Sequence, residues 1–215
     1  MSLRILLADD HKLLRQGLHA LIEEQPYMTV IAEAEDGRTT VQLAAKLRPD
    51  IIVMDISMPG MNGMEATRQI LSNDPDVKVL ALSMHTDKRF IVDMLRAGAS
   101  GYLLKDCAFE ELIHALHALA NQRTYLSPKI SDVVVKDYAC HGSKSMGSSL
   151  DVLSPREREV LQLLAEGKST RIIASTLHVG AKTVETYRKQ IMEKLDIHTI
   201  AELTKFAVRE GLTSL

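Results

Sequence analysis

The sequence predicts an α/β domain built on a five-stranded parallel sheet, followed by a smaller all-α domain. Up to about residue 125, short apolar runs alternate with amphipathic helical patterns, which is typical of a parallel sheet with helices on both faces. The rhythm breaks over 126–150, which ends in a stretch of linker composition, and only helical patterns follow Leu153. We therefore predict domains at 1–125 and 151–215, joined by a linker at 126–150.

The strands are expected at 4–8, 30–34, 51–54, 77–83 and 101–104. The third holds four apolar residues in succession, as strands that are buried on both faces do. The stretches between the strands carry apolar residues at helical spacing. In the first and last helices these are Leu14, Leu18, Leu21 and Ile22, and Leu112, Ala115, Leu116 and Leu119.

Composition limits the class of protein. With 215 residues, 46% of them hydrophobic, the chain can bury one large core or two smaller ones. No run of about 18 apolar residues is present, which argues against a membrane span, and the acidic start argues against a signal peptide. Cys107 and Cys140 form no CxxC motif, which suits a reducing cytoplasm. The net charge of −2 divides into −4 for 1–125 and +1 for each later segment, too mild an asymmetry to establish nucleic-acid binding.

Charged and hydroxyl side chains stand where the predicted strands end. Asp9 and Asp10 follow the first strand, Asp55 the third, Ser83 the fourth and Lys105 the fifth. Because the carboxyl ends of parallel strands meet at one edge of a sheet, we expect these side chains to converge. Crowded carboxylates repel one another, and a divalent cation that prefers oxygen ligands, such as Mg²⁺, relieves the repulsion. With a hydroxyl and an ammonium group added, the set suits a phosphoryl group that is accepted by a carboxylate.

Each of these residues also has a simpler structural interpretation. Asp9 and Asp10 can cap the following helix, Ser83 can be a turn residue, and Lys105 can be a solvated surface residue. Each signal is weak by itself. Their joint position at the ends of the strands favours a functional site.

The first 120 residues or so resemble the receiver domain of two-component response regulators, which has a flavodoxin-like fold. The motifs that carry the resemblance are Asp9-Asp10, Asp55-x-x-Met58-Pro59-Gly60 with Asn62-Gly63, Ser83, and Tyr102-Leu103-Leu104-Lys105. The resemblance implies that Asp55 accepts a phosphoryl group from a histidine kinase. It also implies that Asp10, Asp55 and the main-chain carbonyl of Ser57 bind Mg²⁺, with Asp9 helping through water.

The same resemblance implies that Lys105 and Ser83 contact the phosphoryl oxygens. Ser83 and Tyr102 are then the switch, and the surface around 87–97 and 101–105 changes on phosphorylation. One departure concerns Asp106, which follows Lys105 where many receivers have proline. A cis peptide at this position, which the resemblance suggests, would be a costly non-proline cis bond.

The second domain begins with a helix-start signal, Ser154-Pro155-Arg156-Glu157. Two helices joined by the turn 178–181 follow, and the second of them, 182–195, has a polar, partly basic face opposite its apolar stripe. The stripe consists of Val184, Tyr187, Ile191 and Leu195. This arrangement is typical of a helix-turn-helix DNA reader, although a net charge of +1 alone favours an ordinary helical bundle.

The order of residues in 151–215 resembles the LuxR/NarL-type output domain, through Leu153-Ser154-Pro155-Arg156-Glu157, Glu166-Gly167-Lys168-Ser169 and Lys182-Thr183-Val184. The resemblance implies four helices, the third of which, 182–195, enters the major groove of double-stranded DNA. The residues assigned to DNA contact are Lys182, Thr183, Glu185, Thr186, Arg188 and Lys189. Among them, Glu185, Thr186 and Lys189 are placed at bases, and Lys182 and Arg188 at phosphates.

Three features of this domain bear on the resemblance. Tyr187 replaces a frequent histidine, and Ile172 stands where an acidic residue is usual. The last helix, 199–209, is the one that pairs two output domains in the family, so we expect a homodimer when the chain is phosphorylated or bound to DNA.

We therefore predict a transcription factor that is switched by a cognate histidine kinase and catalyses only its own phosphotransfer and autodephosphorylation. A phosphohydrolase that uses Asp55 as nucleophile is disfavoured, because Ser57 stands where such enzymes have a second aspartate. A receiver that serves only as an interaction module is disfavoured because Asp10, Asp55, Ser83 and Lys105 are all present. Whether the first domain masks the helix 182–195 is left open.

Met84 generates a prediction about the lifetime of the phosphorylated state. It follows Ser83, where many receivers have a small residue, and a bulky side chain there is expected to narrow access to Asp55. Met84→Ala should therefore lose its phosphoryl group faster than the wild type in a dephosphorylation time course. An unchanged rate would exclude this role.

Overall fold

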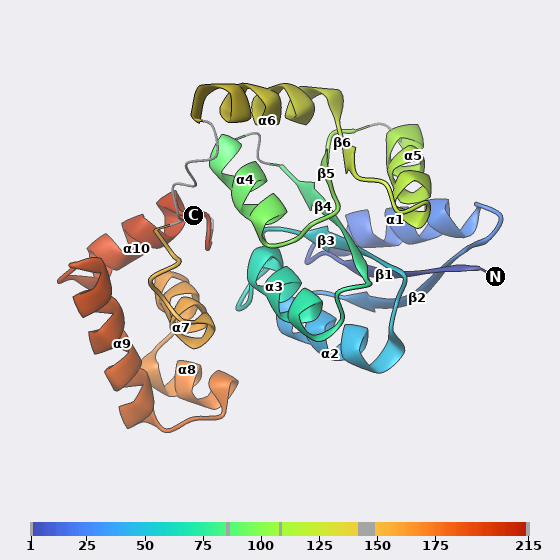
Figure 1. Ribbon diagram of the computed structural model, residues 1–215. Helices are drawn as coiled ribbons and strands as arrows, with labels where there is room; N and C mark the ends of the chain where they lie inside the picture. Colours follow the sequence, from blue (N-terminus) through green and yellow to red (C-terminus); the bar gives the residue numbers. More distant parts are fainter. Residues whose placement is uncertain (1, 85–86, 108, 142–148, 214–215) are drawn as a thin grey trace. The chain divides into compact units, whose positions relative to one another are not determined.

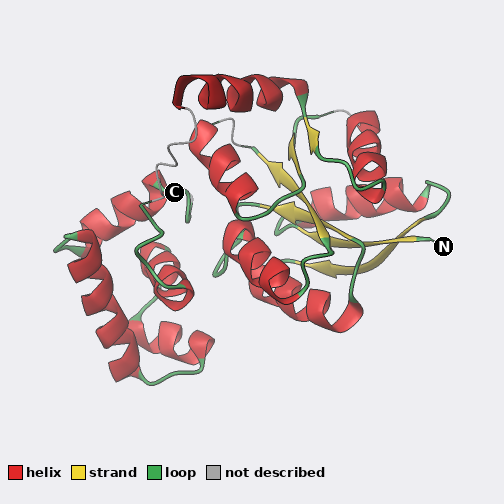
Figure 2. Ribbon diagram, in the orientation of Figure 1, coloured by secondary structure: helices red, strands yellow, loops and turns green. Residues whose placement is uncertain are grey.

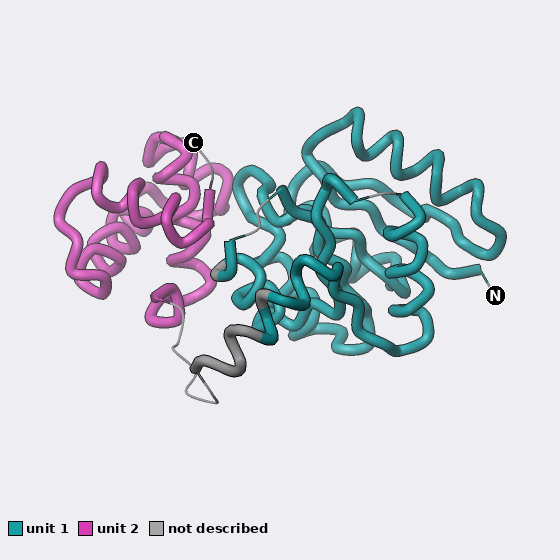
Figure 3. The backbone as a smooth tube through the Cα atoms, turned by 90° about the horizontal axis from the view of Figure 1, so that it is seen from above, with its two compact units in different colours: residues 1–145 teal, residues 146–215 magenta. Residues whose placement is uncertain are grey.

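The computed structural model describes residues 2–84, 87–107, 109–141 and 149–213. The chain divides into two compact units, residues 1–145 and 146–215 (Figure 3). Buried apolar residues form separate clusters in the two units, so each has a core of its own. None of the described helices is both long enough and apolar enough to cross a membrane.

The first unit is a sheet with helices on both faces (Figure 1). Its strands are β1 (Leu3–Ala8), β2 (Met28–Ala34), β3 (Ile51–Asp55), β4 (Lys78–Ser83), β5 (Gly101–Leu104) and β6 (Tyr125–Leu126). Their order is β2-β1-β3-β4-β5-β6, and all neighbouring strands are parallel (Figure 2). Its helices are α1 (Lys12–Glu23), α2 (Gly37–Leu47), α3 (Gly63–Asn73), α4 (Lys88–Arg96), α5 (Phe109–Ala120) and α6 (Pro128–His141).

The predicted parallel α/β architecture is confirmed, with six strands instead of five. The additional strand β6 has two residues, Tyr125 and Leu126, which pair with Gly101 and Tyr102 of β5. A two-residue strand is too short to show any alternation of apolar and polar residues, so no sequence pattern marks it. Its position at the edge of the sheet follows from tertiary pairing alone.

Successive residues of the central strands point into two different cores, one on each face of the sheet. Leu6 and Ile52 belong to the core covered by α2, α3 and α4, to which Ile130 of α6 also contributes. Ile5 and Val53, their neighbours in sequence, belong to the core covered by α1 and α5. Burial on both faces is why these strands read as continuous apolar runs.

Helix α6 occupies 128–141 of the segment 126–150 that we predict as a linker. Ile130 is buried, Val134 is partly buried, and α6 packs beside α4. Ile130 and Val134 thus extend the core of the first unit, and the helix ends at His141, where the stretch of linker composition begins. Residues 142–148 of the expected linker lie outside the described residues.

The loop after Asp55 is held close to the end of β3. The side chain of Asn62 accepts a hydrogen bond from the Glu65 amide at 2.9 Å and caps α3. The amide of Gly63 donates to the carbonyl of Ile56 at 2.9 Å. A Cβ atom on Gly63 would overlap the main-chain carbonyl of Asp55, so α3 can begin this close to Asp55 only with glycine here.

We expect Gly63→Ala to destabilise the first unit by about 1–3 kcal/mol, because the added methyl group must displace the Asp55 main chain. Gly17→Ala is the matched control. Gly17 lies inside α1, nothing lies within 4 Å of the position that an added methyl group would occupy, and alanine there should stabilise by about 0.5–1 kcal/mol. Native-state hydrogen exchange of the β3 amides measures both effects, and a Gly63→Ala variant as stable as the wild type would contradict the close packing.

The second unit contains the four predicted helices around one core. They are α7 (Pro155–Ala165), α8 (Thr170–Leu177), α9 (Ala181–Leu195) and α10 (Ile200–Arg209). The predicted stripe of α9 faces this core, with Val184 and Ile191 buried and Tyr187 and Leu195 partly buried against it. Gly167, in the left-handed region at φ 74°, follows the end of α7.

An ion pair ties the start of α7 to the end of α9. The Ser154 amide donates to Glu157 Oε2 at 2.7 Å, and the Ser154 hydroxyl accepts from the Glu157 amide at 3.3 Å, forming a capping box. Lys194 Nζ lies 2.7 Å from the same carboxylate oxygen. Burial by itself would raise the pKa of Glu157, but the bonds from Lys194 and Ser154 outweigh it and hold that pKa below its ordinary value of 4.5. One buried carboxylate therefore links α7 to α9 in addition to the apolar core that the two helices share.

Glu157→Gln should destabilise the second unit by about 1.5–3 kcal/mol at neutral pH, because it removes a charged hydrogen-bond acceptor. Since the folded-state pKa of Glu157 is lowered, its contribution is complete above the unfolded-state value near 4.5 and is lost as the pH falls through the folded-state value. Urea unfolding followed by NMR signals of α9 at neutral pH and at about pH 3 measures this. Glu193→Gln, exposed on α9, is the control. A difference between Glu157→Gln and wild type that does not shrink in acid would contradict the ion pair.

Candidate functional site

The predicted site residues meet at the carboxyl edge of the sheet. Lys105 Nζ lies 2.7 Å from Asp55 Oδ2 and 2.8 Å from Asp9 Oδ2. Asp55 and Asp9 are each only 2% exposed, and Ser83 at the end of β4 is 1% exposed. The Ser57 amide donates to Asp55 Oδ1 at 3.1 Å. The parallel strands β1, β3, β4 and β5 thus gather side chains that are far apart in sequence.

Burial dominates the electrostatics of this site. Loss of water raises the pKa of Asp55, Lys105 opposes the rise, and the charge of Asp9 adds to it. Burial alone would lower the pKa of Lys105, but its hydrogen bonds with Asp55 and Asp9 outweigh burial, and the pKa is raised. Lys105 is therefore a fixed positive charge beside the Asp55 carboxylate.

Three carboxylates and an imidazole at this edge are close enough to share a metal ion. The ligand atoms of Asp9, Asp10, His11 and Asp55 all lie within 4.8 Å of one another. Asp9 Oδ2 is buried, and its close contact is with the Lys105 ammonium group. Oxygen donors in this number fit a hard divalent cation such as Mg²⁺, which keeps several of its waters.

Two residues of this region were missed by the sequence analysis. His11 lies beside the acidic pair, and its position directly after that pair was the available signal. Arg15 is 8% exposed, and its guanidinium donates to the Asp9 carbonyl and to Glu33 Oε2 of β2 at 2.9 Å. Its place on an otherwise ordinary amphipathic helix gave no signal, because the contact depends on how α1 packs across the sheet.

Ser83 and Tyr102, the predicted switch pair, are joined by a side-chain hydrogen bond. Tyr102 is completely buried, and burial raises its pKa to about 12 against the opposing effect of Ser83. The phenol is therefore neutral at physiological pH. Met84, next to Ser83, is 74% exposed.

The peptide bond after Lys105 differs from the expectation. The described residues contain no cis peptide bond, so the bond between Lys105 and Asp106 is trans. The amide of Lys105 is held by the Ser83 carbonyl at 2.8 Å, and from this position its side chain reaches both carboxylates. A cis bond before a residue other than proline costs about 3 kcal/mol, and Lys105 reaches both carboxylates without it.

The residues predicted to contact DNA lie on the outer surface of α9. All six predicted side chains are exposed or partly exposed: Lys182, Thr183, Glu185, Thr186, Arg188 and Lys189. Lys189 Nζ lies 3.6 Å from Glu193 Oε1, an exposed contact of little strength that leaves the ammonium group available. Ile172 on α8 is 50% exposed, while Tyr187 packs partly against the core. The structure thus presents a polar helix face of mixed charge.

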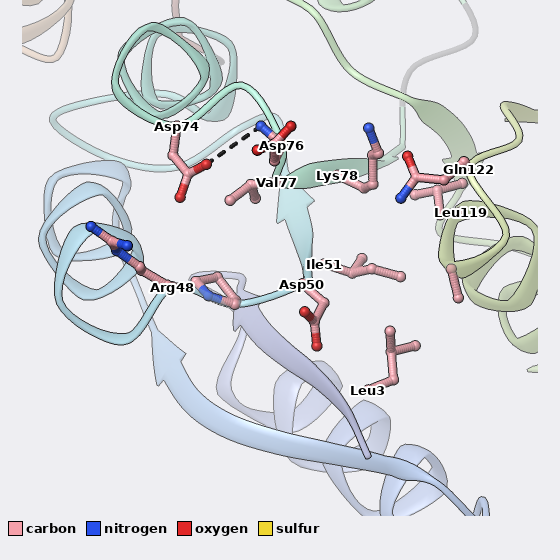
Figure 4. A pocket seen from close by; sticks show the side chains of 12 residues that line it. Leu3, Arg48, Asp50, Ile51, Asp74, Asp76, Val77, Lys78, Leu119 and Gln122 are labelled. Atoms are coloured by element: carbon pink, nitrogen blue, oxygen red, sulfur yellow. Dashed lines mark hydrogen bonds between the residues drawn. The ribbon is translucent and has the colours of Figure 1, made fainter. Parts of the chain in front are cut away.

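A surface pocket of about 440 Å³ lies at the opposite edge of the sheet (Figure 4). The pocket is lined by the first residues of β1, β3 and β4, which are Leu3, Ile51 and Lys78. Arg48 and charged residues of the neighbouring loops complete the lining. Because open α/β sheets bind ligands at the carboxyl ends of their strands, this pocket is not where the chemistry is expected. The acidic edge is the candidate site.

Comparison with known proteins identifies the family. Residues 5–117 match the response regulator receiver domain, and residues 151–207 match the bacterial regulatory proteins of the luxR family. The transcriptional regulatory protein DegU of Brevibacillus brevis is 36% identical, over 98% of this chain and 94% of its own length.

Two solved structures extend the comparison. A LuxR-family two-component response regulator from Aurantimonas sp. SI85-9A1 is 37% identical with a TM-score of 0.62, covering 65% of this chain and 99% of that one. A structure of two RcsB dimers bound to two parallel DNAs is 26% identical with a TM-score of 0.60, covering 96% of this chain and 98% of that one. This chain therefore belongs to the DNA-binding two-component response regulators that join a receiver domain to a LuxR-type output domain.

Proposed function

We propose that Asp55 accepts a phosphoryl group from a histidine kinase, and that the resulting change in the receiver controls DNA binding by the output domain. The observation that carries this proposal is the Lys105 ammonium group, held 2.7 Å from Asp55 and 2.8 Å from Asp9. A positive charge fixed beside a buried carboxylate at the open edge of the sheet is what a transferring phosphoryl group requires.

In the transfer, a carboxylate oxygen of Asp55 attacks phosphorus. The bond from phosphorus to the histidine nitrogen of the kinase breaks, and the imidazole leaves with its electron pair. Lys105 and Ser83 stand beside the acceptor to bind the phosphoryl oxygens. A Mg²⁺ ion held by Asp10, Asp55 and the Ser57 carbonyl, with Asp9 in support, supplies further charge neutralisation when bound.

The readout begins at Ser83. Its hydroxyl bonds with Tyr102 in the present state and would turn to a phosphoryl oxygen on phosphorylation, which releases the phenol. The surface of 87–97 and 101–105 changes as a result. Hydrolysis of the aspartyl phosphate by water, autodephosphorylation, is the only other chemistry that we assign to the chain.

Asp55→Asn should abolish phosphorylation, because the amide is no nucleophile for phosphorus. The wild type, incubated with acetyl phosphate and Mg²⁺, should gain the mass of one phosphoryl group, mapped to Asp55 by borohydride reduction and peptide analysis. Asp76→Asn, an exposed aspartate at the opposite edge of the sheet, is the control and should react like the wild type. A wild type that gains no mass, or an Asp55→Asn variant that does, would disprove the assignment.

For the output domain we propose that α9 is the recognition helix of a homodimer bound to two half-sites. Lys182 and Arg188 are placed at DNA phosphates, and Glu185, Thr186 and Lys189 face the bases, with Thr183 beside them at the start of the helix. The exposure of these side chains supports the assignment. The structure of RcsB, which this chain matches over both domains, contains dimers bound to DNA and supports the proposal of a homodimer.

Lys182→Ala should weaken DNA binding to a similar degree for all sequences, because a phosphate contact carries no sequence information. The slope of log K against log salt should fall by about 0.9 for each copy bound. Fluorescence anisotropy on operator and random duplexes over a salt series measures both quantities. Lys46→Ala, an exposed lysine on α2, is the control. A change in sequence preference with an unchanged salt slope would contradict the phosphate assignment.

A further inference from the structure

We infer that His11 is a nitrogen donor at the cation site, so that the receiver binds borderline transition-metal dications such as Ni²⁺ and Co²⁺ through an imidazole in addition to Mg²⁺. The inference rests on the proposed cation site of Asp9, Asp10 and Asp55. It adds a fourth donor to that site and assigns it a second class of ion.

The spacing of the donor atoms is that of neighbouring ligands around one ion. His11 Nδ1 lies 2.8 Å from Asp10 Oδ1 and 3.3 Å from Asp9 Oδ1. Adjacent ligands of an octahedral ion with bonds of about 2.1 Å are about 3.0 Å apart, and opposite ligands about 4.2 Å. The four donor atoms, including that of Asp55, lie within 4.8 Å of one another, so small side-chain adjustments place them in one coordination sphere.

The backbone fixes His11 while leaving its ring available. The His11 amide donates to Asp9 Oδ1 at 2.8 Å, which holds the turn that carries the acidic pair. His11 occupies the N-cap position of α1, yet its side chain makes no capping hydrogen bond. The ring is 68% exposed, and its Nδ1 contacts are with the Asp9 and Asp10 carboxylates. Turning Nδ1 toward an ion therefore breaks no helix cap and exposes no core.

The chemistry of the ring separates two classes of ion. Mg²⁺ prefers oxygen ligands and holds its waters, so with Mg²⁺ the imidazole stays in contact with Asp10 and outside the coordination sphere. Co²⁺ and Ni²⁺ bind imidazole well, and the tautomer with its proton on Nε2 offers Nδ1 as ligand. If His11 served only as a hydrogen-bonding partner of Asp10, removing it would change the affinity for every cation by a similar factor.

The test compares cation affinities of the full-length chain by isothermal titration calorimetry, for wild type, His11→Ala and His11→Gln. Ni²⁺ and Co²⁺ are titrated with and without saturating Mg²⁺, which isolates the binding that Mg²⁺ competes for. We expect both variants to lose about tenfold or more in Ni²⁺ and Co²⁺ affinity, with less than about a threefold change for Mg²⁺. His198→Ala is the matched control, because His198 also lies beside a carboxylate, 3.5 Å from Asp196, and should leave all affinities unchanged.

A spectroscopic measurement checks coordination directly. With histidine labelled by ¹⁵N, the Nδ1 resonance of His11 should shift strongly on adding one equivalent of Zn²⁺, a diamagnetic ion that also binds imidazole, and should shift little with Mg²⁺. Equal losses for all three ions, no loss in either variant, or an unaffected His11 resonance would overturn the inference while phosphorylation in Mg²⁺ persists. Conversely, Ni²⁺ binding through His11 in a chain that neither binds Mg²⁺ nor becomes phosphorylated would uphold the inference and disprove the proposed function.

Discussion

The ammonium group of Lys105, shared between two buried carboxylates, is the interaction on which the receiver site depends. Two carboxylates that are each 2% exposed repel strongly, and a buried charge without a partner costs several kcal/mol. The Lys105 ammonium group between them offsets both the repulsion and the cost of burying the charges. This arrangement exists only because β1, β3 and β5 run parallel and end at the same edge of the sheet, so the topology and the electrostatics depend on each other.

The output domain also contains a buried carboxylate that is paired with a lysine, here with a single carboxylate instead of two. Glu157 serves the start of α7 through its capping box and the end of α9 through Lys194. This carboxylate thereby links the two helices in addition to their shared core, while the outer face of α9, the proposed recognition helix, remains polar and exposed. Each domain thus contains an ion pair between a buried acidic group and a lysine, and in the output domain the residues proposed to contact DNA are exposed on α9.

The features that could be predicted from the sequence follow from periodicity and chain direction. Asp55, Asp9, Ser83 and Lys105 were expected together because the ends of parallel strands converge, whatever the details of packing. Features that depend on packing were missed, including the contact of Arg15 with the Asp9 carbonyl and the short strand β6. Helix α6 was obscured by the Gly- and Ser-rich stretch that follows it. The expected cis peptide after Lys105 came from the family resemblance, and this chain lacks the proline that lowers the cost of that bond.

Strand β6 connects Tyr102 of β5 to the start of helix α6, where the chain leaves the sheet. Tyr102, whose phenol bonds with Ser83, pairs through its main chain with Leu126, and its carbonyl accepts from the Ser127 amide at 3.2 Å. Helix α6 starts at the next residue and has 14 residues, a length of about 21 Å. Because α6 also packs on the core of the first unit through Ile130 and lies beside α4, a change at Tyr102 would reach the helix both through this hydrogen bond and through the core.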